Sequence, residues 1–217
     1  MIRACIFDMD GLLLDSEHIW FRVNKAFLAR RGCEYNLEMR RAVLGRRERE
    51  TTETLARACG ISEPLESLVK ERKAVMLQEF RSAPDLRLMP GARELLESLK
   101  GKFPLALASS SPRELVEIAV GRTDIAGYFS VIVAGEDVPN GKPSPDPFLL
   151  AAQRLNVPPA DCLVFEDAPN GVAAAKAAGM RCVAVCHAHS PREHLRDADL
   201  VLDSLAEFSF ERFPSGT

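Results

Sequence analysis

The chain begins with a short, mostly apolar run at residues 2–7, which is followed by Asp8, a methionine, Asp10 and Gly11. Such a run, rich in β-branched and aromatic side chains and stopped by Asp and Gly, predicts a buried strand that enters a loop. Open α/β sheets bind ligands in the crevice beyond the carboxyl ends of their strands, so both carboxylates are placed where ligands bind. Because like charges repel, the pair indicates a divalent cation, and Mg²⁺ prefers hard oxygen ligands.

After residue 83, strand-like and helix-like patterns alternate along the chain. Short apolar runs predict buried strands at 104–108, 131–134, 162–165, 182–186 and 200–202. The stretches between them predict helices at about 91–100, 112–121, 147–155, 170–178 and 191–196. This alternation is typical of a mostly parallel sheet that is covered by helices on both faces. We therefore expect the α/β class, with a Rossmann-like parallel sheet at the core.

Residues 16–82 differ from the rest of the chain: they are rich in Arg, Glu, Leu and Ala and contain a single proline, Pro64. Residues 65, 68, 69, 72, 75, 76 and 79 follow the i, i+3, i+4 spacing of an amphipathic helix. The segment as a whole predicts three or four helices. We expect an all-helical cap domain at 16–82, inserted into a core formed by residues 1–15 and 83–217.

Composition excludes several classes of protein. The net charge of −3 over 217 residues argues against a nucleic-acid-binding surface. No apolar run approaches the roughly 20 residues that a membrane-spanning helix needs. The first residues lack the layout of a signal peptide. We expect a cytoplasmic protein, favour a monomer, and expect neither nucleic acid nor a membrane as a partner.

Serines suited to phosphate chemistry follow the second predicted strand. Ser109, Ser110 and Ser111 come directly after it, and Ser111 with Pro112 and Glu114 predicts a capping box at the start of a helix. A helix N-terminus that carries serine hydroxyls can bind an anion. A well-capped helix explains the same pattern, so this segment alone does not prove a site.

A basic residue and a second acidic pair complete the candidate site. Lys142 lies in a segment, 140–147, that three prolines make stiff, and it suits the neutralisation of a nearby negative charge. Glu166 and Asp167 follow the strand predicted before them. With the first acidic pair they would bring four carboxylates near one point of the sheet, which is costly unless a cation lies among them. Acids at a helix N-terminus also interact favourably with its dipole, but we favour a metal site.

Four motifs in this order resemble the haloacid dehalogenase-like phosphatase superfamily, in its branch with a helical cap after the first motif. They are DMDGLLLDSE at 8–17, LASSS at 107–111, GKPSPDPF at 141–148 and LVFEDAPNGVAAAKAAGM at 163–180. Each motif alone is a weak signal, whereas the four together are specific and cover essentially the whole chain.

The resemblance implies a role for each matching residue. Asp8 is the expected nucleophile, which forms an aspartyl-phosphate, and Asp10 is the expected general acid and base. Three groups are expected to bind the phosphate: Ser109, the backbone N–H of Ser110, and Lys142. The expected Mg²⁺ ligands are the carboxylates of Asp8 and Asp167 and the carbonyl of Asp10, with Glu166 as a direct or outer ligand.

Within the family the chain resembles pseudouridine 5′-phosphatases and sugar-phosphate phosphatases. This implies a Mg²⁺-dependent phosphomonoester hydrolase acting on a small phosphorylated metabolite, either a sugar phosphate or a nucleotide. A β-phosphoglucomutase-like isomerase is the alternative within the family, although the histidine and arginine of such mutases align with Trp20 and Glu48 here. A non-catalytic phospholigand-binding protein is the alternative of another class.

Cap residues that face the cleft are expected to select the substrate. The candidates are Glu17, His18, Trp20, Arg46 and Arg47. Each of them also fits an ordinary role, either in the packing of the cap or on a solvated helix face, and none is expected to be catalytic.

Overall fold

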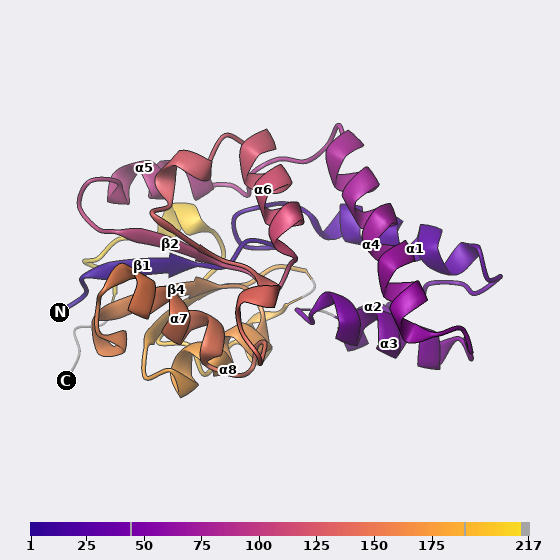
Figure 1. Cartoon of the computed structure of the whole chain (residues 1–217). Helices are drawn as coiled ribbons and strands as arrows, with labels where there is room; N and C mark the ends of the chain where they lie inside the picture. Colours follow the sequence, from indigo (N-terminus) through magenta and orange to yellow (C-terminus); the bar gives the residue numbers. More distant parts are fainter. Residues whose placement is uncertain (44, 189, 214–217) are drawn as a thin grey trace.

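Six parallel strands form one sheet in the part of the chain that the computed structural model describes, residues 1–43, 45–188 and 190–213 (Figure 1). The strands are β1 (Ala4–Phe7), β2 (Leu105–Ala108), β3 (Val131–Val133), β4 (Cys162–Glu166), β5 (Arg181–Val185) and β6 (Leu200–Leu202). Their spatial order is β3-β2-β1-β4-β5-β6, and Cys5 of β1 is level with Leu105 of β2 and Leu163 of β4. The predicted α/β fold with a parallel sheet core is confirmed.

Helices cover both faces of the sheet (Figure 1). They are α5 (Ala92–Leu99), α6 (Arg113–Arg122), α7 (Asp146–Leu155) and α8 (Pro169–Ala177). Because side chains alternate along a strand, Cys5 and Phe7 of β1 pack into the apolar core on the side of α5 and α6. Ala4 and Ile6 pack into the core on the side of α7 and α8. None of the helices in the described residues has the length and apolar character needed to span a bilayer.

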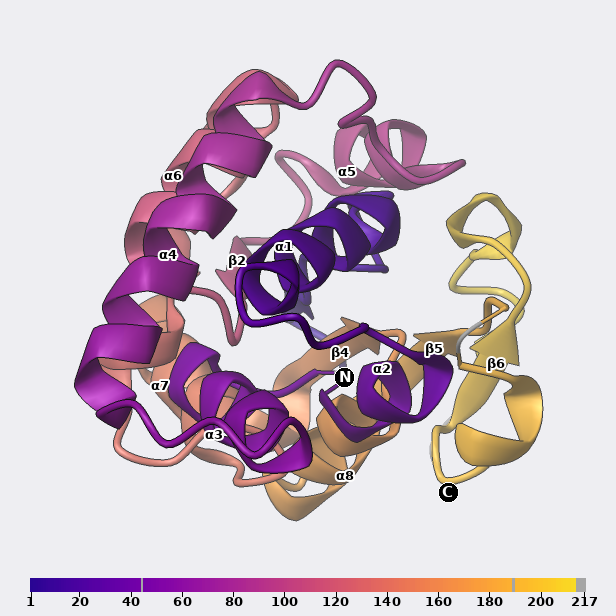
Figure 2. The ribbon, with the colours of Figure 1, turned by 90° about the vertical axis from the view of Figure 1, so that its right-hand side faces the viewer.

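Four further helices form the predicted cap between β1 and α5. They are α1 (Glu17–Ala29), α2 (Leu37–Val43), α3 (Glu48–Ala58) and α4 (Leu65–Ser82). Figure 2 views the molecule from the cap side, with these helices in front of the carboxyl ends of the strands. Phe27, Leu55 and Leu68 belong to an apolar core that lies within the cap. The domain boundaries at 15/16 and 82/83 stay a prediction.

A disulfide between Cys33 and Cys59 joins the segment after α1 to the end of α3. The sequence analysis did not predict this bond. It lies in the cap, beside this apolar core, and holds two cap segments together.

The two segments that connect the cap to the core lie side by side. Leu14 and Leu88 form an antiparallel bridge, and the N–H of Asp15 donates to the carbonyl of Arg87 at 3.0 Å. The N–H of Met89 donates to the carbonyl of Leu13 at 2.9 Å. These bonds make the two connections a single paired hinge beside the first acidic motif.

The helix expected at about 191–196 is wrong. Only a 3₁₀ turn, Arg192–His194, forms there. Ser190 and His187 exchange two backbone hydrogen bonds of 3.0 and 3.1 Å, which close a tight loop just before the turn. The N–H groups of His194, Leu195 and Ala198 each donate to the carbonyl three residues before them, which is the pattern of 3₁₀ turns and not of an α-helix.

Candidate active site

Asp8 lies at the carboxyl end of β1, where the sheet itself fixes its backbone. Its N–H donates to the carbonyl of Phe165 on β4 at 3.0 Å, and the residue is only 8 % exposed. The Lys142 ammonium donates to Asp8 Oδ1 at 2.5 Å, to Glu166 Oε1 at 2.6 Å and to the Ala108 carbonyl at 3.1 Å. The lysine therefore lies between the two acidic motifs, which are more than 150 residues apart in the sequence.

Three carboxylates come together at this point. Ligand oxygens of Asp8, Glu166 and Asp167 all lie within 4.8 Å of one another. Glu166 Oε2 also accepts from the N–H groups of Asp167 and Ala168, at 2.8 and 3.0 Å. A Cβ at Gly171 would lie 1.7 Å from Glu166 Oε1, so only glycine leaves room for this carboxylate at the start of α8.

Burial makes this group of three carboxylates electrostatically unfavourable unless a metal cation is added to the charge of Lys142. It raises the pKa of Asp8 to about 7, with Lys142 opposing and Glu166 reinforcing the effect. Burial, followed by the charges of Glu166 and Asp8, raises the pKa of Asp167 well above its ordinary value. Burial alone would lower the pKa of Lys142, but its two carboxylate partners raise it above the ordinary value. Hard oxygen donors at this spacing fit a divalent cation, which would remove the penalty.

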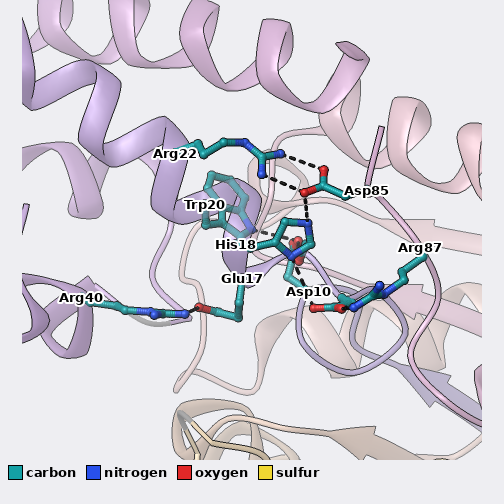
Figure 3. A network of polar contacts seen from close by, with 10 residues as sticks. Asp10, Glu17, His18, Trp20, Arg22, Arg40, Asp85 and Arg87 are labelled. Atoms are coloured by element: carbon teal, nitrogen blue, oxygen red, sulfur yellow. Dashed lines mark hydrogen bonds and ion pairs between the residues drawn. The ribbon is translucent and has the colours of Figure 1, made fainter. Parts of the chain in front are cut away.

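Asp10 lies beside this cluster, with its carboxylate turned toward the cap (Figure 3). Oδ1 accepts from Ser16 Oγ at 2.7 Å and from Trp20 Nε1 at 2.9 Å, and Oδ2 accepts from Ser111 Oγ at 2.9 Å. Burial raises the pKa of Asp10, while these three donors act in the opposite direction. One carboxylate thus receives hydrogen bonds from the hinge, from the cap and from the loop after β2.

Gly11 allows the chain to turn between the two aspartates and α1. It has a φ of +88°, and a Cβ there would lie 2.3 Å from Asp167 Oδ2. Both the backbone conformation and the close approach require glycine at this position.

The serine loop after β2 differs from its prediction. The capping box at Ser111 is wrong, because Pro112 is the N-cap of α6 and the Ser111 hydroxyl donates to Asp10 instead. The N–H of Arg113, at the start of α6, instead donates to the Glu136 carboxylate at 3.0 Å. Ser109, which is 2 % exposed, accepts from the Ser111 N–H at 3.1 Å, and this bond shapes the loop.

A cavity of about 90 Å³ lies between the core and the cap. Its core walls include the predicted nucleophile, acid, phosphate-binding and metal-binding residues: Asp8, Asp10, Ser109, Ser110, Lys142, Glu166 and Asp167. Its cap walls come from α1, α2, α3 and the segments that join them, with Arg72 from α4. The structure therefore brings all of the predicted core residues together at one cavity.

The predicted cap residues divide into two groups. Glu17, Trp20 and Arg46 line the cavity, and Glu17 Oε2 accepts from Arg40 at 2.9 Å (Figure 3). His18, also on α1, instead faces the segments that connect the cap to the core, 3.5 Å from Asp15 and 3.1 Å from Asp85, and is not among the residues lining the cavity (Figure 3).

Arg47 also takes a different position from the one expected of a cleft residue. Its guanidinium extends from the cap to the core and donates to backbone carbonyls there, including those of Val138 and Pro139.

Arg72 and Asn24 are two of the cap-wall residues that the sequence analysis missed. Arg72 of α4 is 2 % exposed, donates to Asn24 Oδ1 at 2.9 and 3.1 Å, and lies 3.0 Å from Glu48 Oε1. Its guanidinium also lies 5.6 Å from the ring centre of Trp20. Arg72 and Asn24 line the cavity. The sequence did contain a signal for Arg72. It stands among apolar residues in the stripe of an amphipathic helix, and an arginine buried there must find polar partners.

His187 is another residue that the sequence analysis did not place at the site. It follows β5, and its Nε2 lies 2.9 Å from Asp167 Oδ2. At this distance the imidazole can fix the orientation of the Asp167 carboxylate, a predicted metal ligand. The position could not be predicted, because it depends on the neighbouring β4 and β5 ending at the same edge.

Known proteins resemble this chain over most of its length. The model of a hydrolase family, the haloacid dehalogenase-like hydrolases, matches residues 2–179. The chain is 38 % identical over 219 residues to a probable pseudouridine-5′-phosphatase of Drosophila melanogaster, covering 98 % of this chain and 94 % of the relative. It is also 38 % identical over 205 residues to a phosphorylated carbohydrates phosphatase of Thermotoga maritima, covering 92 % and 93 %.

A solved structure of similar fold is the β-phosphoglucomutase of Clostridium difficile. The TM-score is 0.85 at 26 % sequence identity, with 97 % of this chain and 95 % of that chain covered. The helical cap and the sheet core are thus both within the range of the likeness.

Proposed function

Because the chain belongs to the haloacid dehalogenase-like hydrolase family, and is a phosphatase of that family, we propose that it is a Mg²⁺-dependent phosphomonoester hydrolase. Its substrate is a small phosphorylated sugar or nucleotide, and the reaction passes through an aspartyl-phosphate on Asp8. The observation that carries the proposal is the Asp8 carboxylate itself, buried in the cavity between Lys142 and two further acids.

The first half-reaction transfers the phosphoryl group to the enzyme. Asp8 Oδ attacks phosphorus, the bond between phosphorus and the ester oxygen breaks, and the leaving oxygen takes a proton from Asp10. Lys142, Ser109 and the Ser110 N–H hold the phosphoryl oxygens. The approach of two anions is the main obstacle, and the fixed charge of Lys142 reduces it.

The second half-reaction returns the enzyme to its starting state. A water attacks the phosphorus of the aspartyl-phosphate, its proton passes to Asp10, and the bond between phosphorus and Asp8 breaks to release inorganic phosphate. The hydrogen bonds from Ser16, Trp20 and Ser111 keep the Asp10 carboxyl in one orientation for both proton transfers.

The cation fits among the acidic residues of the cluster. Asp8, Asp167 and the Asp10 carbonyl would hold Mg²⁺, with Glu166 as a direct or outer ligand. When bound, it offsets the negative charge of the carboxylate and the phosphate and polarises the phosphoryl group. Glu166 is already engaged by Lys142 and by two backbone N–H groups, which favours the outer position for it.

Hydrolysis is favoured over a mutase reaction by the residues found at two cap positions. The histidine and arginine of β-phosphoglucomutase-like enzymes align with Trp20 and Glu48 here, and Glu48 lies in the cavity wall, where it pairs with Arg72 at 3.0 Å. Incubation with β-glucose 1-phosphate and a bisphosphate primer separates the two. Glucose 6-phosphate formed faster than free phosphate would establish the mutase instead.

Phosphate release from p-nitrophenyl phosphate, with Mg²⁺ and with EDTA, tests the proposal. We expect turnover that needs the metal, and no turnover in Asp8→Asn, which keeps the shape of the side chain but lacks a nucleophilic oxygen anion. Near-normal turnover in Asp8→Asn would falsify the covalent route. An inactive but folded protein that binds sugar phosphates tightly would be a phospholigand sensor. A screen of sugar phosphates and nucleotides then identifies the substrate.

A further inference from the structure

Arg47 makes a contact that the reaction described above does not use. It is the N-cap residue of α3, at the cap end that faces the core. Its Nη1 donates to the carbonyl of Pro139 at 2.8 Å, and its Nη2 donates to the carbonyl of Val138 at 2.6 Å and to that of Gly135. One cap side chain therefore engages three backbone carbonyls of the core segment between β3 and α7.

The acceptors belong to the segment that leads directly to Lys142. The first acceptor, Gly135, begins a 3₁₀ turn, Gly135–Asp137, and Lys142 follows three residues after Pro139. A guanidinium presents its donors in a rigid plane, so three carbonyls can bind it only if the segment and the cap hold one relative position. The contact thus links the position of the cap to the conformation of the segment that carries Lys142.

Gly141 is shaped to receive this arginine. A Cβ at position 141 would lie 2.4 Å from Arg47 Cδ and 2.8 Å from Arg47 Cγ. Gly141 is not among the glycines with positive φ, so its own backbone conformation accepts an alanine. Space for the arginine stem, rather than backbone geometry, is what requires glycine here.

We infer that Arg47 is a latch between the cap and the core: it holds the cap closed over the cavity and, through the 135–141 segment, positions Lys142 beside Asp8. Arg47 touches neither substrate nor the reacting atoms, so it is a positioning residue. The inference rests on the proposed phosphatase function for its kinetic consequence, but the latch itself is a physical contact that can be measured without turnover. Closure matters because the cavity has one wall on each domain, and only the closed form excludes water from it.

A double-mutant cycle of Arg47→Ala and Gly141→Ala tests the latch. Charge-assisted bonds from one guanidinium predict a loss of about 10- to 100-fold in kcat/KM for Arg47→Ala. Gly141→Ala should cause a similar loss, because its methyl group displaces the arginine stem. In the Arg47→Ala background the same glycine substitution should have little further effect, since the stem is gone. Arg49→Ala is the matched control: it removes a neighbouring exposed arginine that pairs with Glu66.

The chain carries a single tryptophan, Trp20, whose indole in the cap bonds to Asp10 in the core. Acrylamide quenching of its fluorescence therefore reports closure without any catalysis. We expect stronger quenching, and faster amide hydrogen exchange in 135–142, for Arg47→Ala and Gly141→Ala but not for Arg49→Ala. Arg47→Lys, which keeps the charge but cannot reach three carbonyls, should fall between wild type and Arg47→Ala.

Two results would overturn the latch. One is Arg47→Ala within twofold of wild type in kcat/KM, with unchanged quenching and exchange. The other is a loss from Gly141→Ala that is equally large with and without Arg47. If Gly141→Ala fails to fold, the comparison of the Arg47 and Arg49 variants decides alone. If the wild type shows no turnover, the phosphatase proposal fails, while quenching and exchange still test the latch.

Discussion

Replacing Asp167 by asparagine is expected to stabilise the metal-free protein. The Asp167 side chain is 4 % exposed, and its carboxylate lies within 4.8 Å of those of Asp8 and Glu166. Burial and these two charges raise its pKa well above the ordinary value. Between the ordinary and the raised pKa, the folded protein binds a proton that the unfolded chain does not. The stability of the metal-free protein therefore falls as the pH rises through this window.

The size of this change in stability depends on the pKa of Asp167 in the unfolded chain. Linkage sets an upper bound: an Asp that stayed protonated throughout would cost about 1.4 kcal/mol for each pH unit above roughly 3.9, or about 4 kcal/mol at pH 7 and less than half of that at pH 5. Asparagine carries no such cost, but a weaker contact with His187 offsets about 1 to 1.5 kcal/mol of the gain. For Asp167→Asn we expect a gain of up to about 3 kcal/mol at pH 7 and almost none at pH 5.

Mg²⁺ should largely cancel the advantage of Asp167→Asn over the wild type. A cation present at 100 times its Kd stabilises the folded wild type by about 2.7 kcal/mol. Asp167→Asn lacks one carboxylate of the cluster and should gain much less. The response of the wild type should also grow with pH, because cation binding requires ionised carboxylates and releases their protons.

Urea unfolding at pH 5 and pH 7, in EDTA and in Mg²⁺, measures all of these quantities. Asp199→Asn is the matched control. Burial raises the pKa of Asp199, but bonds from Lys176 at 2.9 Å and from the Cys182 N–H at 2.7 Å hold it below the ordinary value. This control should be less stable than wild type, equally at both pH values and with either addition. An equal loss for Asp167→Asn at both pH values, or an undiminished response to Mg²⁺, would refute the electrostatic account.

Two further variants probe the cap. Trp20→Phe keeps the aromatic packing but removes the Nε1 donor that lowers the pKa of Asp10. We expect kcat to fall about tenfold, and the limb of the pH–rate profile that belongs to Asp10 to move to higher pH. An unmoved limb would count against this role of Trp20. Cys33→Ser with Cys59→Ser opens a crosslink of 26-residue separation and should lower the free energy of unfolding by about 3 kcal/mol in urea, as should dithiothreitol with the wild type. No effect of the reductant would mean that the thiols are not joined, as is usual in the predicted cytoplasmic location.

The sheet was predictable because strands buried on both faces are continuous apolar runs. The predicted run at 200–202 coincides with β6, and the one at 162–165 differs from β4 by a single residue. The acids followed from the same argument, since each pair stands where a strand ends. Lys142 was predictable from its stiff surroundings, which hold it in one place.

Contacts between side chains from distant segments could not be predicted. The pattern at Ser111 is typical of a helix N-cap, but in the folded protein its hydroxyl donates to Asp10, and Glu136, from a distant segment, accepts from the first N–H of the helix. The disulfide requires two cap segments to meet, and only the packed cap shows that Cys33 and Cys59 do so. Arg47 was expected to face the cleft, and instead fills the space that a glycine 94 positions later leaves open.

The order of the strands explains why these particular residues meet. From β1 the chain moves outward to β2 and then to β3, and it resumes on the other side of β1 with β4. The gap between the loops of β1 and β4 is therefore a topological switch point, where open sheets bind ligands. Phe7 is level with Phe165, so Asp8 and Glu166 leave adjacent strands at the same height. The connection from β3 to β4 must cross from the far side of β1 to reach this gap, and Lys142 lies on that crossing. The position of the Lys142 ammonium between the two acidic motifs is thus a consequence of the topology. Arg47 contacts the same connection from the cap.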